Sequence, residues 1–545
     1  MSTCSARLTR HWQCTPVPKS PGQIAAEQHL LCLPWFHGHY IVLSTRIRFN
    51  RWILFGAAFV SQFCVGSLYA WSIYNIPMDT YIFGNPNEEK AVYTFYMACV
   101  SLGSAATIVG PWLERNGPKC GLLLGTSCFL VGYMVATISL YFKSIAGVYV
   151  GYGVIAGFGI GVNYITPASA LIKWFPDMRG TAAGFAVGGF GASSLLWSKV
   201  YLPAIDAMGL PASFLCLGGI MSCIMFACAL VMRTPPPGYS VGGLNMHGMT
   251  AADPSASPHV NPDDAPPSSP HTAIFELEAD AHRPHGDLLD EDEDAHQVWL
   301  KQIKATSLLD SLFSVDFACI HITLLGNIVL GLVVLSRMSS MATIIFHQSK
   351  DQAATLVSIN GLFTCSGQIL VPMLSDVLVR RWHLRPPFAR KCIFVGTLVA
   401  QLGIVATLPY TLRTENFTAF RVQVWVLLVC YGGAFGTVAA FLTDMFGAHN
   451  IGGLHGCVLT AWSLAGLVGG LGFTLHFNHL VNDLHLPLVD AYVENLYWVA
   501  GVVVVGLLAV LAVRTSAKDR FAPGYQYSIC GTPIVRVGHK NLPPR

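Results

Sequence analysis

The chain has 545 residues, of which 53% are hydrophobic and only 11% are charged. Soluble globular proteins carry about 25% charged residues, so this composition excludes an ordinary soluble protein and indicates one that lies in a membrane. The net charge of +3, from 32 basic and 29 acidic residues, gives no global basicity, and we expect no nucleic-acid partner.

The sequence also lacks the motifs of common soluble enzymes. It contains no Cys-x-x-Cys pair, no His-Glu-x-x-His, no Gly-x-x-x-x-Gly-Lys loop and no Gly-x-Ser-x-Gly elbow. Twelve of the 16 cysteines fall in apolar runs, which argues against a disulfide framework. We therefore expect no enzyme, with no catalytic residues, no metal site and no cofactor.

Apolar runs long enough to cross a membrane occur six times in the first part of the chain. A membrane-spanning helix needs about 20 mostly apolar residues. The six predicted spans are 52–78, 91–113, 120–142, 145–172, 181–202 and 212–232.

Glycines recur every four residues in the fourth and fifth of these spans. This spacing puts them on one stripe of a helix, where the missing side chains let another helix approach closely. The stripe indicates tight packing, or smooth contacts between helices that slide in a transporter. The six glycines are Gly153, Gly157, Gly161, Gly180, Gly184 and Gly188.

A polar segment separates the two apolar parts of the chain. Residues 235–294 hold ten prolines and end in the acidic run Asp290-Glu291-Asp292-Glu293-Asp294. Such a stretch buries too little apolar surface to offset its chain entropy, so we expect a disordered linker. Its histidines are irregularly spaced, which favours a plain solvated linker over metal binding.

Six further runs follow the linker and complete the predicted architecture. They are 314–346, 353–379, 392–412, 422–446, 453–477 and 496–513. We predict an all-α membrane protein with twelve transmembrane helices in two six-helix bundles. The predicted divisions are 1–50, an N-terminal segment; 51–233, the first bundle; 234–312, the linker; 313–514, the second bundle; and 515–545, a C-terminal tail.

Basic residues near the span ends predict the orientation. They concentrate on the side that holds both termini and the linker, which predicts that this side is cytoplasmic. The opposite loops carry fewer basic residues: Lys90, Lys143, Lys199, Lys350, Arg413 and Arg421. The first 45 residues hold three basic residues against Glu27 alone, as organelle transit segments do, but their Pro and His content breaks the amphipathic pattern. We therefore favour the plasma membrane over an organelle.

A charged loop follows the second span, and a similar loop follows the eighth span. The first copy runs from Gly110 to Lys119 and the second contains Asp376, and recurrence at matching places in both halves indicates an internal repeat. The first copy resembles the loop signature of the major facilitator superfamily, Gly-x-x-x-Asp-Arg-x-Gly-x-Lys. The resemblance implies a gating role for Gly110, Glu114, Arg115, Gly117, Lys119, Asp376 and Arg380.

Three further stretches resemble the oxalate:formate antiporter family and its monocarboxylate-transporter relatives. They are residues 66–74, 173–180 and 235–239, within a similarity that covers roughly 50–515 without the linker. The resemblance implies two bundles that rock about a central site and move a small organic anion. Family members that bind oxalate use an arginine in the eighth span and a lysine in the eleventh. Gln368 and Trp462 stand at those positions here, so oxalate itself is not expected.

One arginine lies deep in a predicted span without an obvious acidic partner. Arg337 in the seventh span is a candidate anion ligand, and snorkelling toward the headgroups is its alternative. Other polar and aromatic residues could complete the site or join helices to one another. They are Gln62, Tyr69, Trp71, Tyr74, Asn75, Asn163, Tyr164, Asn327, Asn360 and Gln368, with Trp462 at the second anchor position. His321 is a further candidate, as carrier of a coupling proton.

We predict a secondary active or facilitative transporter that moves a small organic anion, a monocarboxylate rather than a dicarboxylate, by alternating access. The expected partners are this anion and the lipid bilayer, and we expect a monomer. The alternative is a transporter-like nutrient sensor that signals through its linker, which a flux assay would separate from a carrier.

Overall fold

The structure is a computed structural model. It describes residues 11–12, 19–34, 40–42, 46–86, 88, 90–245, 299, 302–303, 306–522, 524–529 and 532–537. The middle of the predicted linker, 246–298, with its acidic run, lies outside the described residues.

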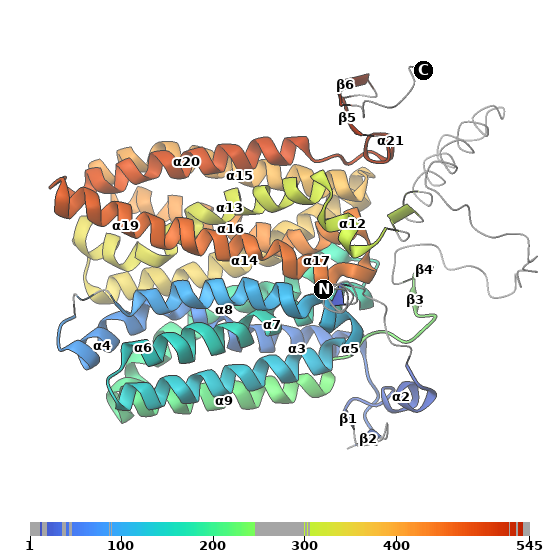
Figure 1. Ribbon diagram of the computed structural model, residues 1–545, viewed down its shortest axis with the longest axis horizontal. Helices are drawn as coiled ribbons and strands as arrows, with labels where there is room; N and C mark the ends of the chain where they lie inside the picture. Colours follow the sequence, from blue (N-terminus) through green and yellow to red (C-terminus); the bar gives the residue numbers. More distant parts are fainter. Residues whose placement is uncertain are drawn as a thin grey trace, which may run out of the picture.

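Helices of the first half run back and forth between two faces of the molecule (Figure 1). We call the end at which α3 begins the terminal face, and the other end the opposite face. The elements are α3 Arg51–Val65, continued by the 3-10 stretch η2 Gly66–Ala70 and by α4 Ser72–Phe83; α5 Val92–Tyr141; α6 Ile145–Val148, continued by the π-helical stretch η3 Tyr149–Ala156 and by α7 Gly157–Trp174; α8 Arg179–Met208; and α9 Leu210–Val231.

The second half repeats this back-and-forth arrangement. Its elements are the short α12 Leu308–Leu312; α13 Val315–Ser340 with η4 Met341–Ile345; α14 Lys350–Trp382; α15 Pro386–Arg413; α16 Phe417–Phe446; η5 Ala448–Asn450, α17 Ile451–Val458, α18 Thr460–Ala465, η6 Gly466–Gly472, α19 Phe473–Asn478 and η7 His479–Asp483 in one continuous run; and α20 Leu488–Ala512.

Ten helices of the described chain are long and apolar enough to cross a membrane. One of them is α5, whose 50 residues would extend about 75 Å, against about 30 Å for the hydrocarbon core. Gly117 divides α5 into two helices, since its φ of 80° and ψ of 166° are not helical. The sequence predicts twelve crossings, two more than these ten; counting α5 as two helices supplies one more, and α8, with 30 residues, is long enough to be the other but is not among the ten.

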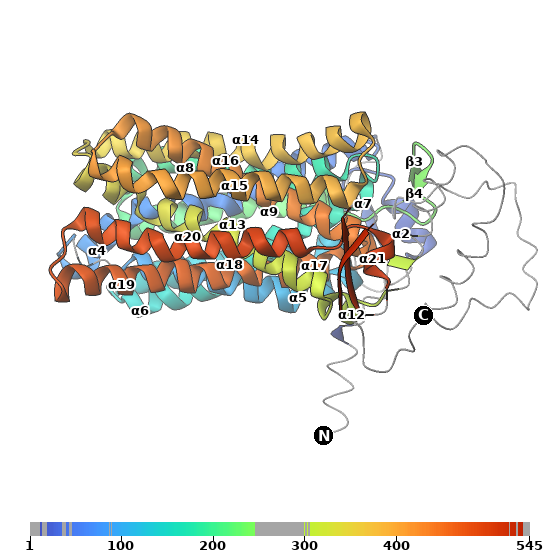
Figure 2. The same ribbon diagram turned by 90° about the horizontal axis from the view of Figure 1, so that it is seen from above.

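Smaller elements lie at the terminal face, outside the long helices (Figure 2). They are α2 Pro21–Ala26, α21 Ala517–Arg520 and three antiparallel hairpins: β1 Cys32–Pro34 with β2 Tyr40–Val42, β3 Ser240–Val241 with β4 Leu244–Asn245, and β5 Tyr525–Ile529 with β6 Thr532–Val537. The hairpin β3–β4 and helix α12 both fall within the range 234–312 that the sequence predicts as linker.

Glycine stripes let the helices pack closely, as the sequence predicts. In α7, a Cβ added at Gly157 would lie 2.9 Å from the Ala98 Cα of α5, within the first half. In α8, a Cβ at Gly184 would lie 2.5 Å from the Gln368 carbonyl oxygen of α14, in the other half. The second stripe therefore forms part of the contact between the two halves.

The two halves meet mainly at two places. At one, α8 packs on α14 and α16, and at the other, the first part of α5 packs on α17 and α18. At the second place, a Cβ at Gly110 would lie 2.5 Å from the Gly452 carbonyl oxygen, so the backbones touch there as well. Figure 1 shows the halves side by side, and in both views the long helices of the two halves end at the same two faces.

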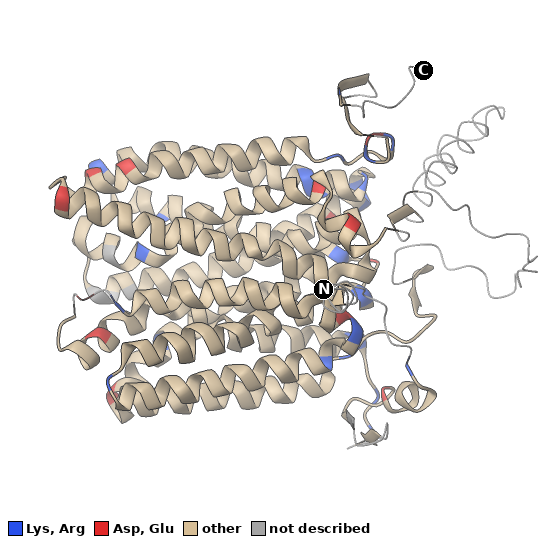
Figure 3. Ribbon diagram, viewed as in Figure 1, with Lys and Arg blue, Asp and Glu red and all other residues tan. Residues whose placement is uncertain are grey.

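Charged residues lie mainly near the two ends of the long helices. Figure 3 shows Lys and Arg gathered mainly at the terminal face, while most of the length of the helices carries neither acids nor bases. Exposed apolar side chains such as Ile108, Ile138, Leu370 and Leu508 cover that length, as expected of a surface in contact with lipid. The protein is an integral, multi-pass membrane protein.

Four basic residues expected in loops lie within helix bounds, namely Lys199, Lys350, Arg413 and Arg421. The sequence places Arg421 before the tenth span, but α16 already begins at Phe417 because the Asn416 side chain caps it, accepting a hydrogen bond from the Ala419 amide at 3.0 Å. Lys199 lies within α8, inside the predicted span 181–202. Hydropathy misses the first turn of α16 because a side-chain cap, and not apolarity, starts that helix.

Candidate functional site

An aromatic cluster fills the centre of the interface between the two halves. Trp462 of α18 is its hub, with its ring centroid 4.9 Å from that of Phe435, 5.7 Å from Phe190, 5.8 Å from Tyr164 and 6.1 Å from Tyr69. We call the set the central cluster; its members are Tyr69, Tyr164, Phe190, Gln368, Tyr431, Phe435, His455 and Trp462.

The members come from both halves of the chain. The Tyr69 hydroxyl of η2 donates a hydrogen bond to the Tyr431 hydroxyl of α16 at 3.1 Å. The His455 ring of α17 lies 5.9 Å from the Tyr164 ring of α7. Gln368 of α14 joins the cluster beside Phe190, because its Oε1 accepts a hydrogen bond from the Gly191 amide of α8 at 3.0 Å.

Several polar atoms of the central cluster are buried without a hydrogen-bond partner among the described residues. They are the Trp462 Nε1, the Tyr164 hydroxyl, the Gln368 Nε2 and both ring nitrogens of His455. Leaving a buried polar group unpaired costs about 1–3 kcal/mol, so native cores rarely collect several in one place. The cluster is therefore equipped to donate hydrogen bonds to a ligand.

The central cluster is closed to solvent at both faces. Trp462 and Gln368 are fully buried, and even Tyr69, its most exposed aromatic member, is 9% exposed. A cavity of about 20 Å³, room for about one water, lies beside Tyr69 and is also lined by Trp71, Asn75 and Ser336. A ligand reaches the cluster only if the two halves separate at one face.

Of the residues predicted to bind substrate, Tyr69, Tyr164, Gln368 and Trp462 come together in this cluster. Trp71 and Tyr74 do not: they belong to a second aromatic group inside the first half. The Trp71 ring stacks on Tyr152 at 4.2 Å, and the Tyr74 ring lies 4.3 Å from Tyr201.

Three predicted asparagines join helices within one half. Asn163 lies 3.4 Å from the Thr126 hydroxyl, with an amide orientation that can be reversed to bond the α5 backbone. Asn327 donates to the Thr397 hydroxyl at 3.0 Å and accepts from Gln401.

Asn360, the third, faces inward from α14. Its Nδ2 lies against the Met338 sulfur, and its Oδ1 is buried without a partner among the described residues. Of these three asparagines, only Asn360 has a buried side-chain oxygen without a hydrogen-bond partner among the described residues.

Arg337 lies apart from the central cluster, toward the opposite face. Its Nη2 donates to the Thr474 hydroxyl at 2.9 Å, and its guanidinium lies over the Phe477 ring at 4.8 Å. The same Thr474 hydroxyl contacts the Tyr96 hydroxyl of the first half at 3.4 Å. No ion pair within the described residues includes Arg337, and the side chain borders the interface between the halves.

A first set of predicted gating residues closes the terminal face between α5 and α17. The buried Glu114 carboxylate accepts a hydrogen bond from the Gly452 amide of the other half at 2.6 Å, at the start of α17. Glu114 also accepts from the Ser169 hydroxyl at 3.0 Å and pairs with Lys173. A carboxylate placed at a helix N-terminus is stabilised by the helix dipole.

The second set closes the same face between α8 and α14. Asp376 accepts hydrogen bonds from the Gly180 amide at 3.1 Å and from the Thr181 amide and hydroxyl at 2.7 and 2.8 Å, at the start of α8. Arg390 donates to Asp376 at 2.7 Å and to Asp444 at 3.1 Å, and Asp444 also accepts from Arg179 of the first half at 3.2 Å. Each half thus supplies a carboxylate that caps a helix of the other.

Of the remaining predicted gating residues, Gly110 lies at the close contact of α5 with Gly452, and the other four surround these contacts without bridging α5 to α17. Gly117 forms the break in α5, and Arg115 lies 3.4 Å from the His11 ring. The Lys119 ammonium donates to the Cys32 carbonyl oxygen at 2.6 Å. Arg380 donates to the backbone carbonyl of Asp177, a second link between the halves near Asp376.

Sequence reasoning missed four members of the central cluster: Phe190, Tyr431, Phe435 and His455. His455 carried a usable signal, because it lies seven residues before Trp462 and therefore on the same helical face. His321, the histidine singled out instead, is half-buried and contacts the Thr460 hydroxyl at 2.8 Å.

Known proteins resemble this chain in sequence and in fold. The family model described as Major Facilitator Superfamily matches residues 36–470. The uncharacterized MFS-type transporter YhjX of Escherichia coli (strain K12) is 20% identical over 423 residues, which cover 77% of this chain and 86% of that protein. The oxalate:formate antiporter of Oxalobacter formigenes is 27% identical over 193 residues, which cover 35% of this chain and 45% of that protein.

A solved structure extends the likeness to three dimensions. The proton:xylose symporter XylE, bound to 6-bromo-6-deoxy-D-glucose, matches with a TM-score of 0.57 at 14% identity, over 85% of this chain and 95% of that one. At this low identity, the match shows a shared fold and nothing of the ligand.

Proposed function

This chain belongs to the major facilitator superfamily, and on that premise we propose that it carries a small organic anion with a single carboxylate across a membrane by alternating access. Family and fold are those of transporters. Similarity to an oxalate:formate antiporter supports the choice of a small carboxylate as cargo.

The central cluster is the observation that carries the proposal. Trp462, Tyr164 and Gln368 bring buried hydrogen-bond donors to one place between the two halves, and none of these donors has a partner among the described residues. A carboxylate has two oxygens and about four acceptor positions, so it can take several such donors at once. Hydrogen bonds to a charged acceptor are about twice as strong as neutral ones.

The absence of a fixed charge in the cluster favours one carboxylate over two. By the resemblance to the oxalate:formate antiporter family, Gln368 and Trp462 stand where the oxalate-binding members have an arginine and a lysine. Arg337, beside the interface toward the opposite face, supplies a positive charge that an anion would meet on its way to the cluster. The rings of Phe190 and Phe435 leave an apolar wall for the rest of a small molecule.

In this proposal, the contacts between the halves at the terminal face form the gate. Glu114 and Asp376 hold the halves together there by charged hydrogen bonds to helix starts. When these bonds break and the halves rock apart, the central cluster opens to the terminal face, which we propose is cytoplasmic. We further propose a monomer that resides in the plasma membrane.

The test is uptake into vesicles that contain the purified protein. Labelled formate, pyruvate and lactate should enter, and excess unlabelled monocarboxylate should compete, whereas oxalate should do neither. Trp462→Phe keeps a ring but removes the indole N–H, and it should raise the half-saturation concentration about tenfold through loss of one charged hydrogen bond. Trp382→Phe, on the exposed end of α14, is the matched control and should leave uptake unchanged.

Three results would overturn the proposal. Binding of monocarboxylates without any flux would indicate a sensor in place of a carrier. Strong oxalate uptake would show that the site accepts two carboxylates, and full activity of Trp462→Phe would show that the cargo does not depend on this donor of the central cluster.

A further inference from the structure

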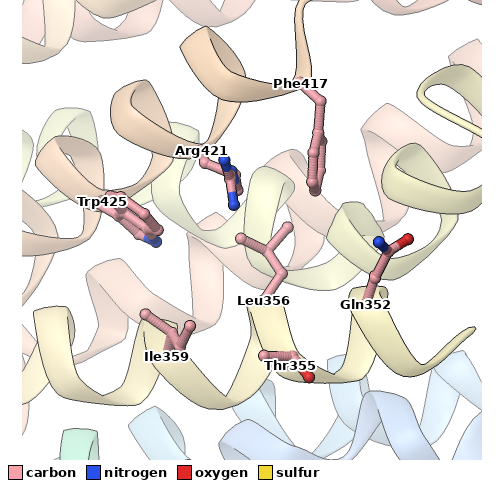
Figure 4. A pocket seen from close by; sticks show the side chains of 7 residues that line it. All are labelled: Gln352, Thr355, Leu356, Ile359, Phe417, Arg421 and Trp425. Atoms are coloured by element: carbon pink, nitrogen blue, oxygen red, sulfur yellow. The ribbon is translucent and has the colours of Figure 1, made fainter. Parts of the chain in front are cut away.

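A second cavity lies between α14 and α16, near the opposite face (Figure 4). Its volume is about 270 Å³, just below the range of about 300–1,000 Å³ typical of small-molecule sites. α14 contributes one wall, with Leu356 buried and Gln352 exposed at the mouth. The first turns of α16 contribute the other, with Arg421 one turn after the helix start at Phe417.

Besides the Thr355 hydroxyl, the polar side chains that line this cavity offer N–H donors. The Arg421 Nε and the Trp425 Nε1 are both buried, and neither has a hydrogen-bond partner among the described residues. Gln352 turns its oxygen to the Ser349 amide at 3.1 Å, and Figure 4 shows its nitrogen on the cavity side. A site that offers an arginine and two uncharged N–H groups is suited to an anion.

The arginine is fixed in place but not neutralised. Its guanidinium lies 5.0 Å from the Phe417 ring and 5.9 Å from the Trp425 ring, and the Trp425 ring is itself stacked on Phe363 at 5.0 Å. No ion pair within the part of the chain that the structure describes includes Arg421. The aromatic rings hold the charge by cation–π contacts, which leaves its hydrogen-bonding edge available to a ligand.

We propose that this cavity is a second binding site, for a small monoanion. Its carboxylate or phosphate group takes the hydrogen bonds of Arg421, Trp425 and Gln352. Its apolar part lies against Leu356, Ile359 and Phe417. The anionic group belongs either to a free small molecule or to the headgroup of a lipid, and the measurements below separate these sources.

The site is separate from the central cluster. Arg421 and Tyr431 are ten residues apart on α16, or about 15 Å along the helix. No residue that lines this cavity belongs to the central cluster. The two sites can therefore be emptied independently by substitution.

Saturation binding of labelled butyrate to the purified full-length protein tests the free-anion source. Arg421→Gln removes the charge, and we expect it to bind one butyrate fewer per chain than the wild type. The predicted result is this difference of one butyrate per chain between the wild type and Arg421→Gln. It is expected whether or not the central cluster also binds butyrate. Arg413→Gln, at the exposed Arg413–Asp490 pair of the same face, is the control and should match the wild type.

A milder variant distinguishes loss of the binding site from loss of folding. Trp425→Phe keeps the stacking on Phe363 but removes the indole N–H, so it should keep the full number of butyrates while weakening one site about tenfold.

Native mass spectrometry of protein extracted from vesicles of phosphatidylcholine and phosphatidylglycerol tests the lipid source. If the wild type retains one more phosphatidylglycerol than Arg421→Gln while both bind equal butyrate, the ligand is a lipid phosphate. Equal counts of both molecules in the two proteins would overturn the site.

Discussion

Asp376→Asn is the most direct test of the terminal-face gate. The carboxylate accepts three hydrogen bonds from Gly180 and Thr181 of the other half and a fourth from Arg390. Asparagine keeps the shape but loses the charge and one acceptor oxygen. Bonds to a charged group contribute about 1.5–3 kcal/mol each and neutral ones about 0.5–1.5 kcal/mol. Allowing for the bonds that asparagine retains, we expect the closed gate to lose about 2–4 kcal/mol, or roughly 30- to 1,000-fold in its equilibrium constant.

Hydrogen exchange measures this loss where it occurs. The Thr181 amide donates directly to Asp376, so its exchange reports each opening of the contact. Peptides that contain Thr181 should exchange faster in Asp376→Asn by the factor given above, while peptides from the opposite-face end of α8 should not change.

Asp490→Asn, at the exposed pair with Arg413, is the matched control and should leave exchange at Thr181 unaltered. Equal protection of Thr181 in wild type and Asp376→Asn would refute the capping argument. Other contacts at this face, among them Glu114 with Gly452 and Arg179 with Asp444, would then hold it closed without a contribution from Asp376.

Four further outcomes follow from the same structure. Arg337→Gln should reduce monocarboxylate uptake about tenfold without lowering thermal stability, and unchanged flux would show that the arginine only snorkels. His455→Phe keeps the ring packing but removes both nitrogens, and it should weaken competition by unlabelled pyruvate; equal competition would exclude His455 from the site. Gly456→Ala should cost about 1–3 kcal/mol of stability in thermal unfolding because its methyl group would overlap the α5 backbone, whereas Gly501→Ala, with open space around it, should not. A protease site placed within 246–298 should be cut only after cells are permeabilised, and cleavage from outside would reverse the orientation.

Much of the architecture could be predicted from the sequence because it follows from the hydropathy of the chain and from the spacing of its glycines. Apolar runs located the crossings, and glycines four residues apart indicated helix contacts such as that of Gly184 with α14. The acidic loop positions Glu114 and Asp376 matched a known signature. Their reciprocal capping of α17 and α8 needed the structure, since the caps join parts of the chain that are distant in sequence.

The composition of the candidate site was harder to predict, since a polar residue in a span can face either a ligand or a neighbouring helix. Asn327 is satisfied by Thr397 and Gln401 within one half, although its residue type suits a binding site equally well. Phe190 and Phe435 are indistinguishable by type from the many phenylalanines that face lipid or core. Only the position of Trp462 between the halves shows which rings gather around it.

The reciprocal caps also determine what a single fault at the terminal face should produce. Glu114 and Asp376 act on two helix pairs, α5 with α17 and α8 with α14, and each pair joins the same two halves of the chain. If one cap is lost, the other pair of helices stays joined, so a single substitution should make the closed terminal face less stable without freeing the two halves from each other. The two caps are thus redundant fastenings, and damage to one of them should shift the resting balance toward the state that is open at the terminal face.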